Sequence, residues 1–526
     1  MIEAEVHYSL HNFLRSQGEA SWHHHLTMAR LVARGLRLKR SALIQVGAGS
    51  GYQGRYRLSY LAPALMWQGA VIVVAPEKIQ QQLLRVEIPP LQQWLQTDKK
   101  ILTGDSWIDD DFQGLLIVSP AAWLAAQLQN TGKFPANIPT ILDGVDDLEA
   151  WTRTQLTASI QASDWDELML AFPQQVEAIR NARVQLTKAI FQHPVNPYEY
   201  YLSTQQEKEI LGSLYQELKL SSPNTAQSNS KPTAAIAASK SHQLYMPNAW
   251  RHFWQSSQDN QLLWATVARS QGAFSLHSTP VEVASALAPI WSRQPVVLVG
   301  SALEQEAEAP IYRKNLGLGE LTCLKFSDDR RENLIQLYLP DRLPLPNTAE
   351  FQTAFIEKVH SLLSLTAAST GSTVILVGDV PLKAQVGATL AAEFGSRVQV
   401  EKTTSLDERS ILVTGWEFWR QHQNELPTPR LLIIATLPLP SLENPLVAGR
   451  VAYYKHKHQD WFRFYLLPTA LNELARAIAP VRDRQGVVAL LDSRVLHRSY
   501  GSQVLAALSP MARIDYLDSN LLTPTN

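Results

Sequence analysis

The sequence predicts an α/β protein that has two parallel-sheet lobes and a helical insertion. Short, continuously apolar runs recur along the chain, and helix-length stretches separate them. Strands of a parallel sheet are covered on both faces, so they read as unbroken apolar runs rather than as alternating ones. A strand-poor region divides these runs into two series, which indicates two sheets rather than one.

The apolar runs define the expected strands of each lobe. Each is bounded by Gly, Pro or polar residues, as is typical of a buried strand. The first lobe is expected to contain the runs at 42–47, 70–76, 114–120, 138–144 and 295–303. The second is expected to contain those at 372–379, 410–416, 429–438 and 486–494, with helices such as 383–394 between them.

The region between the two series predicts an insertion. Residues 151–217 are rich in helix-forming patterns, and residues 220–241 are a low-complexity Ser/Ala/Pro/Asn segment that cannot bury a core. The expected boundaries are therefore a first lobe over 1–150 and again over 246–305, a helical insertion over 151–245, and a second lobe over 306–526.

Composition restricts the classes of function. The formal net charge is −1, so any site for a polyanion must be a local patch. The single cysteine, Cys323, excludes an intramolecular disulfide and a four-thiolate zinc or iron–sulfur site. The sequence contains no apolar signal core and no apolar run of membrane-spanning length. We therefore expect a soluble, cytoplasmic, monomeric protein without an iron–sulfur cluster.

A glycine-rich turn follows the first apolar run. Gly47, Gly49 and Gly51 would let the backbone approach a phosphate or ribose at the start of the next helix. A phosphate-binding loop would continue with Lys and then Ser or Thr, but Tyr52 and Gln53 stand there instead. Turns of this kind also occur without a ligand, so the turn alone leaves nucleotide binding open.

The order of motifs along nearly the whole chain resembles the DinG/XPD-like superfamily 2 helicases. The resemblance implies two RecA-like lobes, ATP and magnesium as cofactors, ATP-dependent DNA unwinding in DNA repair, and single-stranded DNA or RNA as partner. Its segments include WHHHLTMARLVARGL, QGRYRLSYLAPAL, GLLIVSPAAWLAAQL, ILDGVDDLEAW, VVLVGSAL, LIQLYLPDRLPLPN, LPLPSLENPLVAGR and DRQGVVALLDSRVLHRSYG.

The chemistry that this resemblance implies is largely missing. Asp143 keeps the metal-binding position, whereas Gly144 replaces the Glu that positions water. In the last motif Arg476 keeps one finger-type arginine, and Ala479 replaces the other. The candidate catalytic residues are thus Asp143 and Arg476, with Asp143 also the candidate metal ligand. The candidate cofactor-binding residues are Gly47, Gly49, Gly51, Tyr52, Gln53 and Arg55. We expect a nucleic-acid-binding pseudoenzyme in which ATP hydrolysis is lost or strongly impaired.

A basic and aromatic segment provides the candidate nucleic-acid contacts. Residues 453–458 read Tyr-Tyr-Lys-His-Lys-His, and Trp-Phe-Arg follows at 461–463, a pattern typical of single-strand binders. The candidates are Lys455, Lys457 and Arg463. An amphipathic segment with buried aromatic residues explains the pattern equally well, and a protein partner is a further expectation.

Two other functions remain open. In an active helicase, Arg55 could replace the missing lysine, because it lies on the same helix face as Tyr52. The sequence VGAGSGY also matches the first motif of S-adenosylmethionine-dependent methyltransferases, with Glu77 near the end of the next strand for the ribose. The methyltransferase alternative leaves the second series of strands unexplained.

Overall fold

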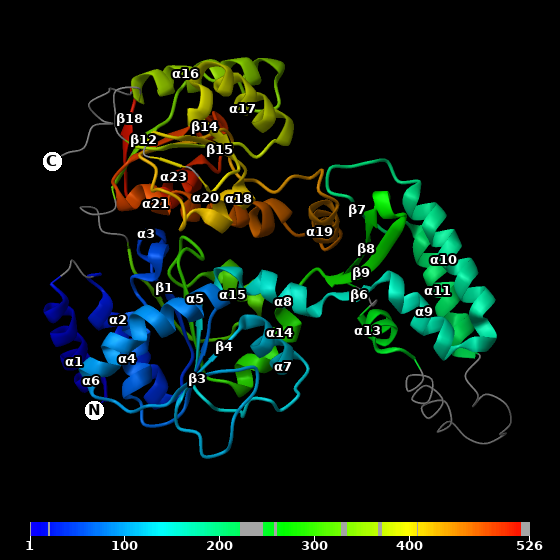
Figure 1. Cartoon of the computed structure of the whole chain (residues 1–526), viewed down its shortest axis with the longest axis horizontal. Helices are drawn as coiled ribbons and strands as arrows, with labels where there is room; N and C mark the ends of the chain where they lie inside the picture. Colours follow the sequence, from blue (N-terminus) through cyan, green and yellow to red (C-terminus); the bar gives the residue numbers. More distant parts are fainter. Residues whose placement is uncertain are drawn as a thin grey trace. The chain divides into compact units, whose positions relative to one another are not determined.

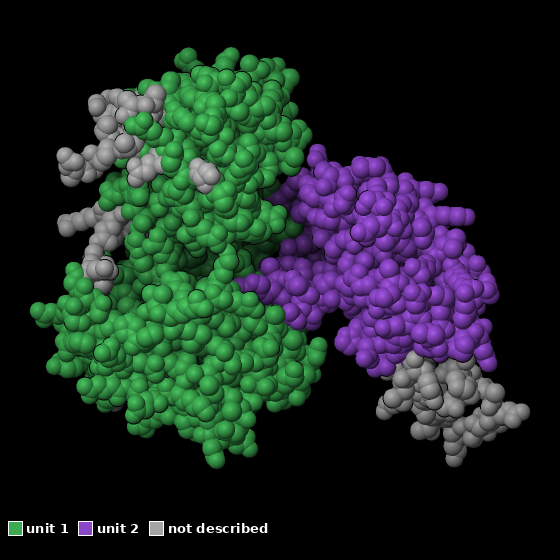
Figure 2. Space-filling view, viewed as in Figure 1, with its two compact units in different colours: residues 1–148, 284–439, 462–526 green, residues 149–283, 440–461 purple. Residues whose placement is uncertain are grey.

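The computed structural model describes residues 2–18, 22–220, 246–256, 260–327, 334–366, 371–404, 406–407 and 409–516. Apart from Leu220, the predicted low-complexity segment lies outside these residues. The chain forms two compact units, which Figure 2 distinguishes by colour. Unit 1 comprises residues 1–148, 284–439 and 462–526, and unit 2 comprises residues 149–283 and 440–461.

The first lobe of unit 1 is built on a seven-stranded sheet in which every pairing is parallel. Its central strands are buried on both faces, as the apolar runs predict; all four residues of the strand 71–74 are buried. In spatial order the strands are β11 (Thr322–Lys325), β1 (Ala42–Gln45), β10 (Val296–Gly300), β5 (Thr140–Asp143), β2 (Val71–Val74), β4 (Leu115–Val118) and β3 (Ile101–Thr103).

Helices cover this sheet, and α1, α2, α4 and α6 share one core with its strands (Figure 1). Side chains such as Leu10, Met28 and Leu61 pack there against Ile44 and Val73. The helices of the first lobe are α1 (Ile2–Gln17), α2 (His25–Leu38), α3 (Ala48–Gly51), α4 (Leu58–Met66), α5 (Glu77–Gln82), α6 (Ile88–Leu95), α7 (Pro120–Leu128), α14 (Ala284–Arg293) and α15 (Pro310–Leu316).

The second lobe of unit 1 has a second seven-stranded parallel sheet. Its strands in spatial order are β14 (Val398–Val400), β15 (Ile411–Thr414), β13 (Thr373–Leu376), β16 (Leu431–Ile434), β17 (Val487–Leu490), β12 (Ile335–Tyr338) and β18 (Met511–Ile514). Two apolar cores, one on each face, confirm that the sheet is covered on both sides.

Helix α17 of the second lobe begins at residues that favour the start of a helix. Asp379 caps α17 by accepting a hydrogen bond from the backbone N–H of Leu382, and Pro381 occupies the first turn. The helices are α16 (Ala349–Thr366), α17 (Val380–Phe394), α18 (Trp416–His422), α20 (Leu467–Ala477), α21 (Ala479–Asp483), α22 (Arg494–His497) and α23 (Gly501–Ala507).

Unit 2 combines helices with a four-stranded antiparallel sheet (Figure 1). The strands in spatial order are β6 (Ala158–Ile160), β9 (Ala273–Pro280), β8 (Gln261–Ala268) and β7 (Tyr200–Leu202). Its helices are α9 (Ala162–Ala171), α10 (Val176–Phe191), α11 (Gln205–Leu220), α13 (Asn248–Ser256) and α19 (Pro445–His456), and α8 (Leu148–Leu156) begins at the boundary with unit 1.

The two parallel sheets confirm the predicted fold class, but three segments lie elsewhere than expected. Strands β8 and β9 belong to unit 2, although residues 246–305 were expected to return to the first lobe. Strand β11 pairs with β1 in the first sheet, beyond the expected boundary at 305. Helix α19 belongs to unit 2 because it packs against β7 and β8. The place of each of these segments depends on contacts between residues far apart in the sequence, and apolar runs do not predict such contacts.

Candidate functional site

The glycine-rich turn begins as predicted, but its helix is interrupted. After β1, Gly47 adopts φ +85° and is followed by a single helical turn, α3. A short 3₁₀ segment, Tyr52–Gly54, comes next, and within it Gln53 has φ +61°. Helix α4 starts only at Leu58. The aligned peptide dipoles that a long helix would place behind a phosphate are therefore limited to one turn.

This turn packs closely against the loop that follows β10. A Cβ atom on Gly51 would lie 2.4 Å from the Cβ of Ser301, so only glycine fits there. The carboxylate of Asp146 holds the same loop, accepting hydrogen bonds from the backbone N–H groups of Ser301 (2.8 Å) and Ala302 (3.0 Å). Gly47, Gly49 and Tyr52 are also buried. Packing within the lobe thus accounts for at least one of the three glycines.

Asp143, the candidate metal ligand, is fully buried at the end of β5. One carboxylate oxygen accepts a short hydrogen bond from the hydroxyl of Tyr56. The other accepts hydrogen bonds from the hydroxyl of Tyr60 at 2.9 Å and from Nε of Arg57 at 3.1 Å. Protein donors therefore engage both oxygens, and an internal guanidinium balances the charge.

Arg57 joins two carboxylates. It pairs with Asp143, and its Nη1 lies 3.1 Å from Oε1 of Glu87. Its side chain is 7% exposed, so the charge would be costly without these partners. Gly54 makes the arrangement possible, because a Cβ atom there would lie 2.2 Å from the guanidinium carbon of Arg57. The fourth glycine of this segment thus makes room for the buried arginine.

The ionisation of this cluster follows from burial and from Asp143. Burial raises the pKa of Tyr56 and of Tyr60 well above the usual range, and the negative charge of Asp143 raises both further. Burial acts to lower the pKa of Arg57, but Asp143, followed by the two tyrosines and Glu87, outweighs it and the pKa is raised. Arg57 is therefore charged and both tyrosines are protonated donors.

The residues at this position do not fit a magnesium–nucleotide site. Magnesium requires carboxylate oxygens that can face the ion, whereas those of Asp143 face Arg57, Tyr56 and Tyr60. Among the residues that the structure describes, no group of three His, Cys, Asp or Glu side chains is arranged to hold a metal ion.

The two other charged candidates of the nucleotide site pair with acidic residues of the opposite lobe. Nη1 of Arg476, on α20, lies 2.9 Å from Oδ1 of Asp147, which follows β5. Arg55 of the first lobe pairs with Asp483 at the end of α21. Burial acts to lower the pKa of Arg476, but Asp147, Asp146 and Glu473 outweigh it and raise the pKa. The structure brings Arg55 and Arg476 to the glycine turn, while Asp143 lies behind it in the core.

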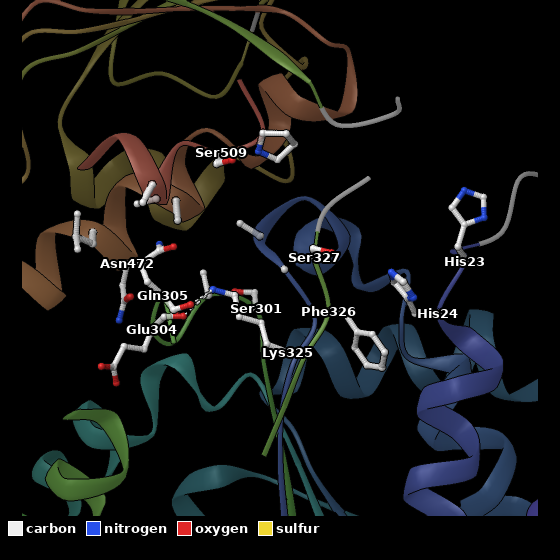
Figure 3. Close-up of a pocket in the computed structure, with 18 residues that line it drawn as sticks. His23, His24, Ser301, Glu304, Gln305, Lys325, Phe326, Ser327, Asn472 and Ser509 are labelled. Carbon is white, nitrogen blue, oxygen red and sulfur yellow. Dashed lines mark hydrogen bonds between the residues drawn. The ribbon is translucent and has the colours of Figure 1, made fainter. Parts of the chain in front are cut away.

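Both lobes of unit 1 line a cavity of about 840 Å³ beside this turn. Gly47 and Ala48 contribute from the turn. In Figure 3, Asn472 and Ser509 come from the second lobe, and the other labelled side chains come from the first. Nζ of Lys325 donates hydrogen bonds to the backbone oxygens of Glu304 (3.0 Å) and Gln305 (2.7 Å), so this lysine braces the cavity wall.

The candidate nucleic-acid residues are exposed but are divided between the units. Lys455 and Lys457 lie at the end of α19 in unit 2, and Arg463 lies in unit 1. Nζ of Lys455 lies 5.4 Å from the ring centroid of Trp461, and Nζ of Lys457 lies 5.6 Å from that of Tyr453. Each lysine therefore makes a cation–π contact within its own segment, and both remain exposed.

Sequence reasoning missed Tyr56, Arg57 and Tyr60, which enclose Asp143. A signal was present, because Tyr56 and Tyr60 are four residues apart and so share one helix face. The local sequence gives no sign that Arg57 points inward. The guanidinium of Arg57 fits in the core only because Gly54 has no Cβ atom.

Comparison with known proteins shows which proteins this chain resembles. A helicase C-terminal domain family matches residues 427–511. The ATP-dependent DNA helicase YoaA of Escherichia coli (strain K12) is 31% identical over 107 residues, which are 20% of this chain and 17% of that protein. The C-terminal part of the chain is therefore similar to the C-terminal domain of helicases. The chain thus spans about a sixth of the length of the curated relative that it matches.

Solved structures support the fold over nearly the whole chain. An XPD helicase structure matches 93% of this chain and 99% of its own, with a TM-score of 0.58 at 12% identity. The S. tokodaii Xpd4 structure matches 94% of this chain and 100% of its own, with a TM-score of 0.56 at 12% identity. The resemblance expected from the motifs is confirmed, and the methyltransferase alternative is left without support. Among the described residues, no helix is long and apolar enough to span a membrane.

Proposed function

We propose that this protein binds single-stranded nucleic acid on its DinG/XPD-like helicase fold and does not hydrolyse ATP. The observation that carries the proposal is the enclosure of Asp143 by Arg57, Tyr56 and Tyr60. In phosphoryl-transfer enzymes, a carboxylate at this kind of position holds magnesium, which neutralises the charge that develops on the transferred phosphoryl group. In this protein the same carboxylate neutralises a buried arginine.

The remaining substitutions support the same conclusion. Tyr52 and Gln53 supply neither an ammonium group for the phosphates nor a hydroxyl in the usual position, and Gly144 supplies no carboxylate to orient water. The alternative of an active helicase uses Arg55 as the replacement cation. That arginine pairs with Asp483, so binding a phosphate would first require breaking this ion pair.

Nucleic-acid binding is supported by the helicase fold and by the exposed cations Lys455, Lys457 and Arg463. The aromatic residues beside the two lysines could stack on bases, which gives affinity with little sequence preference. The net charge of −1 limits the long-range attraction, so we expect weak, salt-sensitive binding.

The test is phosphate release by the purified full chain with ATP and magnesium, with and without single-stranded DNA, alongside fluorescence anisotropy on the same DNA. We expect a binding isotherm without phosphate release above background. Turnover of about 1 s⁻¹, within the usual range of phosphoryl-transfer enzymes, that disappears in Asp143→Asn would contradict the loss of hydrolysis. Loss of that turnover in Arg55→Ala would identify the active-helicase alternative.

A further inference from the structure

The glycine turn of the first lobe is in contact with helices of the second lobe. Both α20 and α21 pack against α3. Two small side chains on these helices, Ala475 on α20 and Ala479 on α21, are buried, with exposed fractions of 5% and 4%. Ala479 is the position at which the family resemblance places an arginine. An alanine there lets the second lobe approach the turn that a nucleotide would otherwise separate from it.

Two ion pairs join the lobes around this contact, and the cation comes from a different lobe in each pair. Arg476 extends from the second lobe to Asp147 of the first, at 2.9 Å. Arg55 extends from the first lobe to Asp483 of the second. A third pair, in which Nζ of Lys78 lies 2.6 Å from Oε1 of Glu425, also joins the lobes but is largely exposed. Each lobe thus contributes both cations and anions, and the pairs can form together only when the two lobes lie in this relative position.

The Arg476 and Arg55 pairs are both partly buried, whereas the Lys78 pair is exposed. The side chains of Arg476 and Asp147 are 18% and 40% exposed and those of Arg55 and Asp483 are 43% and 21% exposed, against 79% and 51% for Lys78 and Glu425. Asp146, next to Asp147, adds to the negative field at the guanidinium. Opening the lobes would remove these attractions but would also return the charges to water, so each pair contributes modestly and the three pairs act together.

From this arrangement we infer that the ion pairs latch the two lobes together without nucleotide. A ligand that bridges two lobes shifts the equilibrium between open and closed forms by its preferential binding to the closed form. In this protein, side chains of the chain itself bridge the lobes, so the closed form is favoured at moderate salt without ATP. This inference concerns the lobes of unit 1 and does not depend on nucleic-acid binding.

The inference can be tested by single-molecule energy transfer between dyes on the two lobes. In a Cys323→Ser background, the exposed residues Ser106 and Ser396 are replaced by cysteine and labelled. Arg55→Asp or Asp483→Arg should each increase the ratio of open to closed molecules by about two- to fivefold, the range for an exposed pair. The double variant Arg55→Asp/Asp483→Arg should restore the ratio, because it recreates the pair with the charges exchanged. Arg476→Gln should have the largest effect.

Salt provides a measurement that requires no substitution in the latch. Between about 0.1 M and about 1 M NaCl, the Debye length falls from about 10 Å to about 3 Å, so the open fraction should rise. The control is Arg183→Asp, which breaks an exposed ion pair with Asp166 inside unit 2 and should leave the transfer efficiency unchanged. Constant transfer across the salt series and all latch variants would overturn the inference, as would closure that occurs only after ATP and magnesium are added. Phosphate release is measured separately, so hydrolysis would contradict the proposed function without altering this readout.

Discussion

Replacing Arg57 with methionine should destabilise the first lobe more than any other single arginine replacement near the glycine turn. The change keeps much of the aliphatic volume but leaves Asp143 fully buried without its counter-charge, and it leaves Glu87 with an exposed fraction of only 13%. Removing one partner of a buried ion pair typically costs about 3–5 kcal/mol. The hydroxyl groups of Tyr56 and Tyr60 remain as donors to Asp143, which favours the lower half of this range.

The appropriate assay is native-state hydrogen exchange of the backbone amides of β5 and α4, combined with the free energy of unfolding in urea. The variants are compared on condition that the dependence of this free energy on urea concentration is unchanged. Asp143→Asn should cost less, about 1–3 kcal/mol, because the amide can still accept one tyrosine hydroxyl and Arg57 keeps Glu87. The double variant Arg57→Met/Asp143→Asn should cost less than the sum of the two single variants, by about 0.5–3 kcal/mol, as expected for residues in contact.

Arg85→Met provides the matched control, since Arg85 is exposed two residues before Glu87 and its loss should change stability by less than about 0.5 kcal/mol. If Arg57→Met left both the urea midpoint and the exchange of β5 at the values of the unmodified protein, the buried-pair reasoning would be refuted. Additivity of the two single variants would likewise show that Arg57 and Asp143 do not interact.

Two further predictions concern nucleic acid and pH. The double variant Lys455→Gln/Lys457→Gln should reduce the log–log salt slope of single-strand binding by about one to two units. The control variant Lys208→Gln/Lys219→Gln, on α11, should leave the slope unchanged. Fluorescence anisotropy across a salt series measures both slopes, and equal slopes in the two variants would argue against the site. Burial lowers the pKa of His25 from 6.5 to about 4, so the unfolded chain binds the proton more readily than the folded chain does. Unit 1 should therefore lose stability, on the order of 3 kcal/mol, as the pH falls from about 6.5 to about 4. His25→Gln should flatten this dependence in urea unfolding and the exposed His23→Gln should not, and an unchanged profile in the His25 variant would contradict the assignment.

Much of the fold was predictable because the strands of a parallel sheet are buried on both faces and so form continuous apolar runs in the sequence. The apolar runs identified β1, β2, β4, β5 and β10 of the first sheet, and β13, β15, β16 and β17 of the second. The edge strands were missed because they are short and partly exposed; the burial of β11 is incomplete at all four residues. The antiparallel pair β8 and β9 was also missed. Strand β8 is largely apolar, but Ser275, His277, Ser278 and Thr279 interrupt the apolar residues of β9, and one face of the pair is only half-buried.

The site was less predictable, because it depends on which partner each charged side chain finds. The sequence correctly identified a glycine turn and a carboxylate at the end of a buried strand. The same carboxylate can hold a metal ion or an internal cation, and the choice depends on Arg57, three residues beyond a glycine that makes room for its guanidinium. Arg55 and Arg57 differ little in the local sequence, yet one lies 43% exposed in an ion pair and the other is buried.

Once Arg57 is buried, the acidic residue at 143 is needed for stability whether or not it has a role in catalysis. Substituting Asp143 would leave a guanidinium in the core with only Glu87 as a charged partner, so the carboxylate has a structural role. Its presence is therefore weak support for a metal site in this chain. Conversely, a lysine at position 52 would not recreate that site by itself, because both oxygens of Asp143 would still accept hydrogen bonds from Arg57 and the two tyrosines. The interdependence of these side chains gives the strand-end carboxylate a structural role that requires no metal ion.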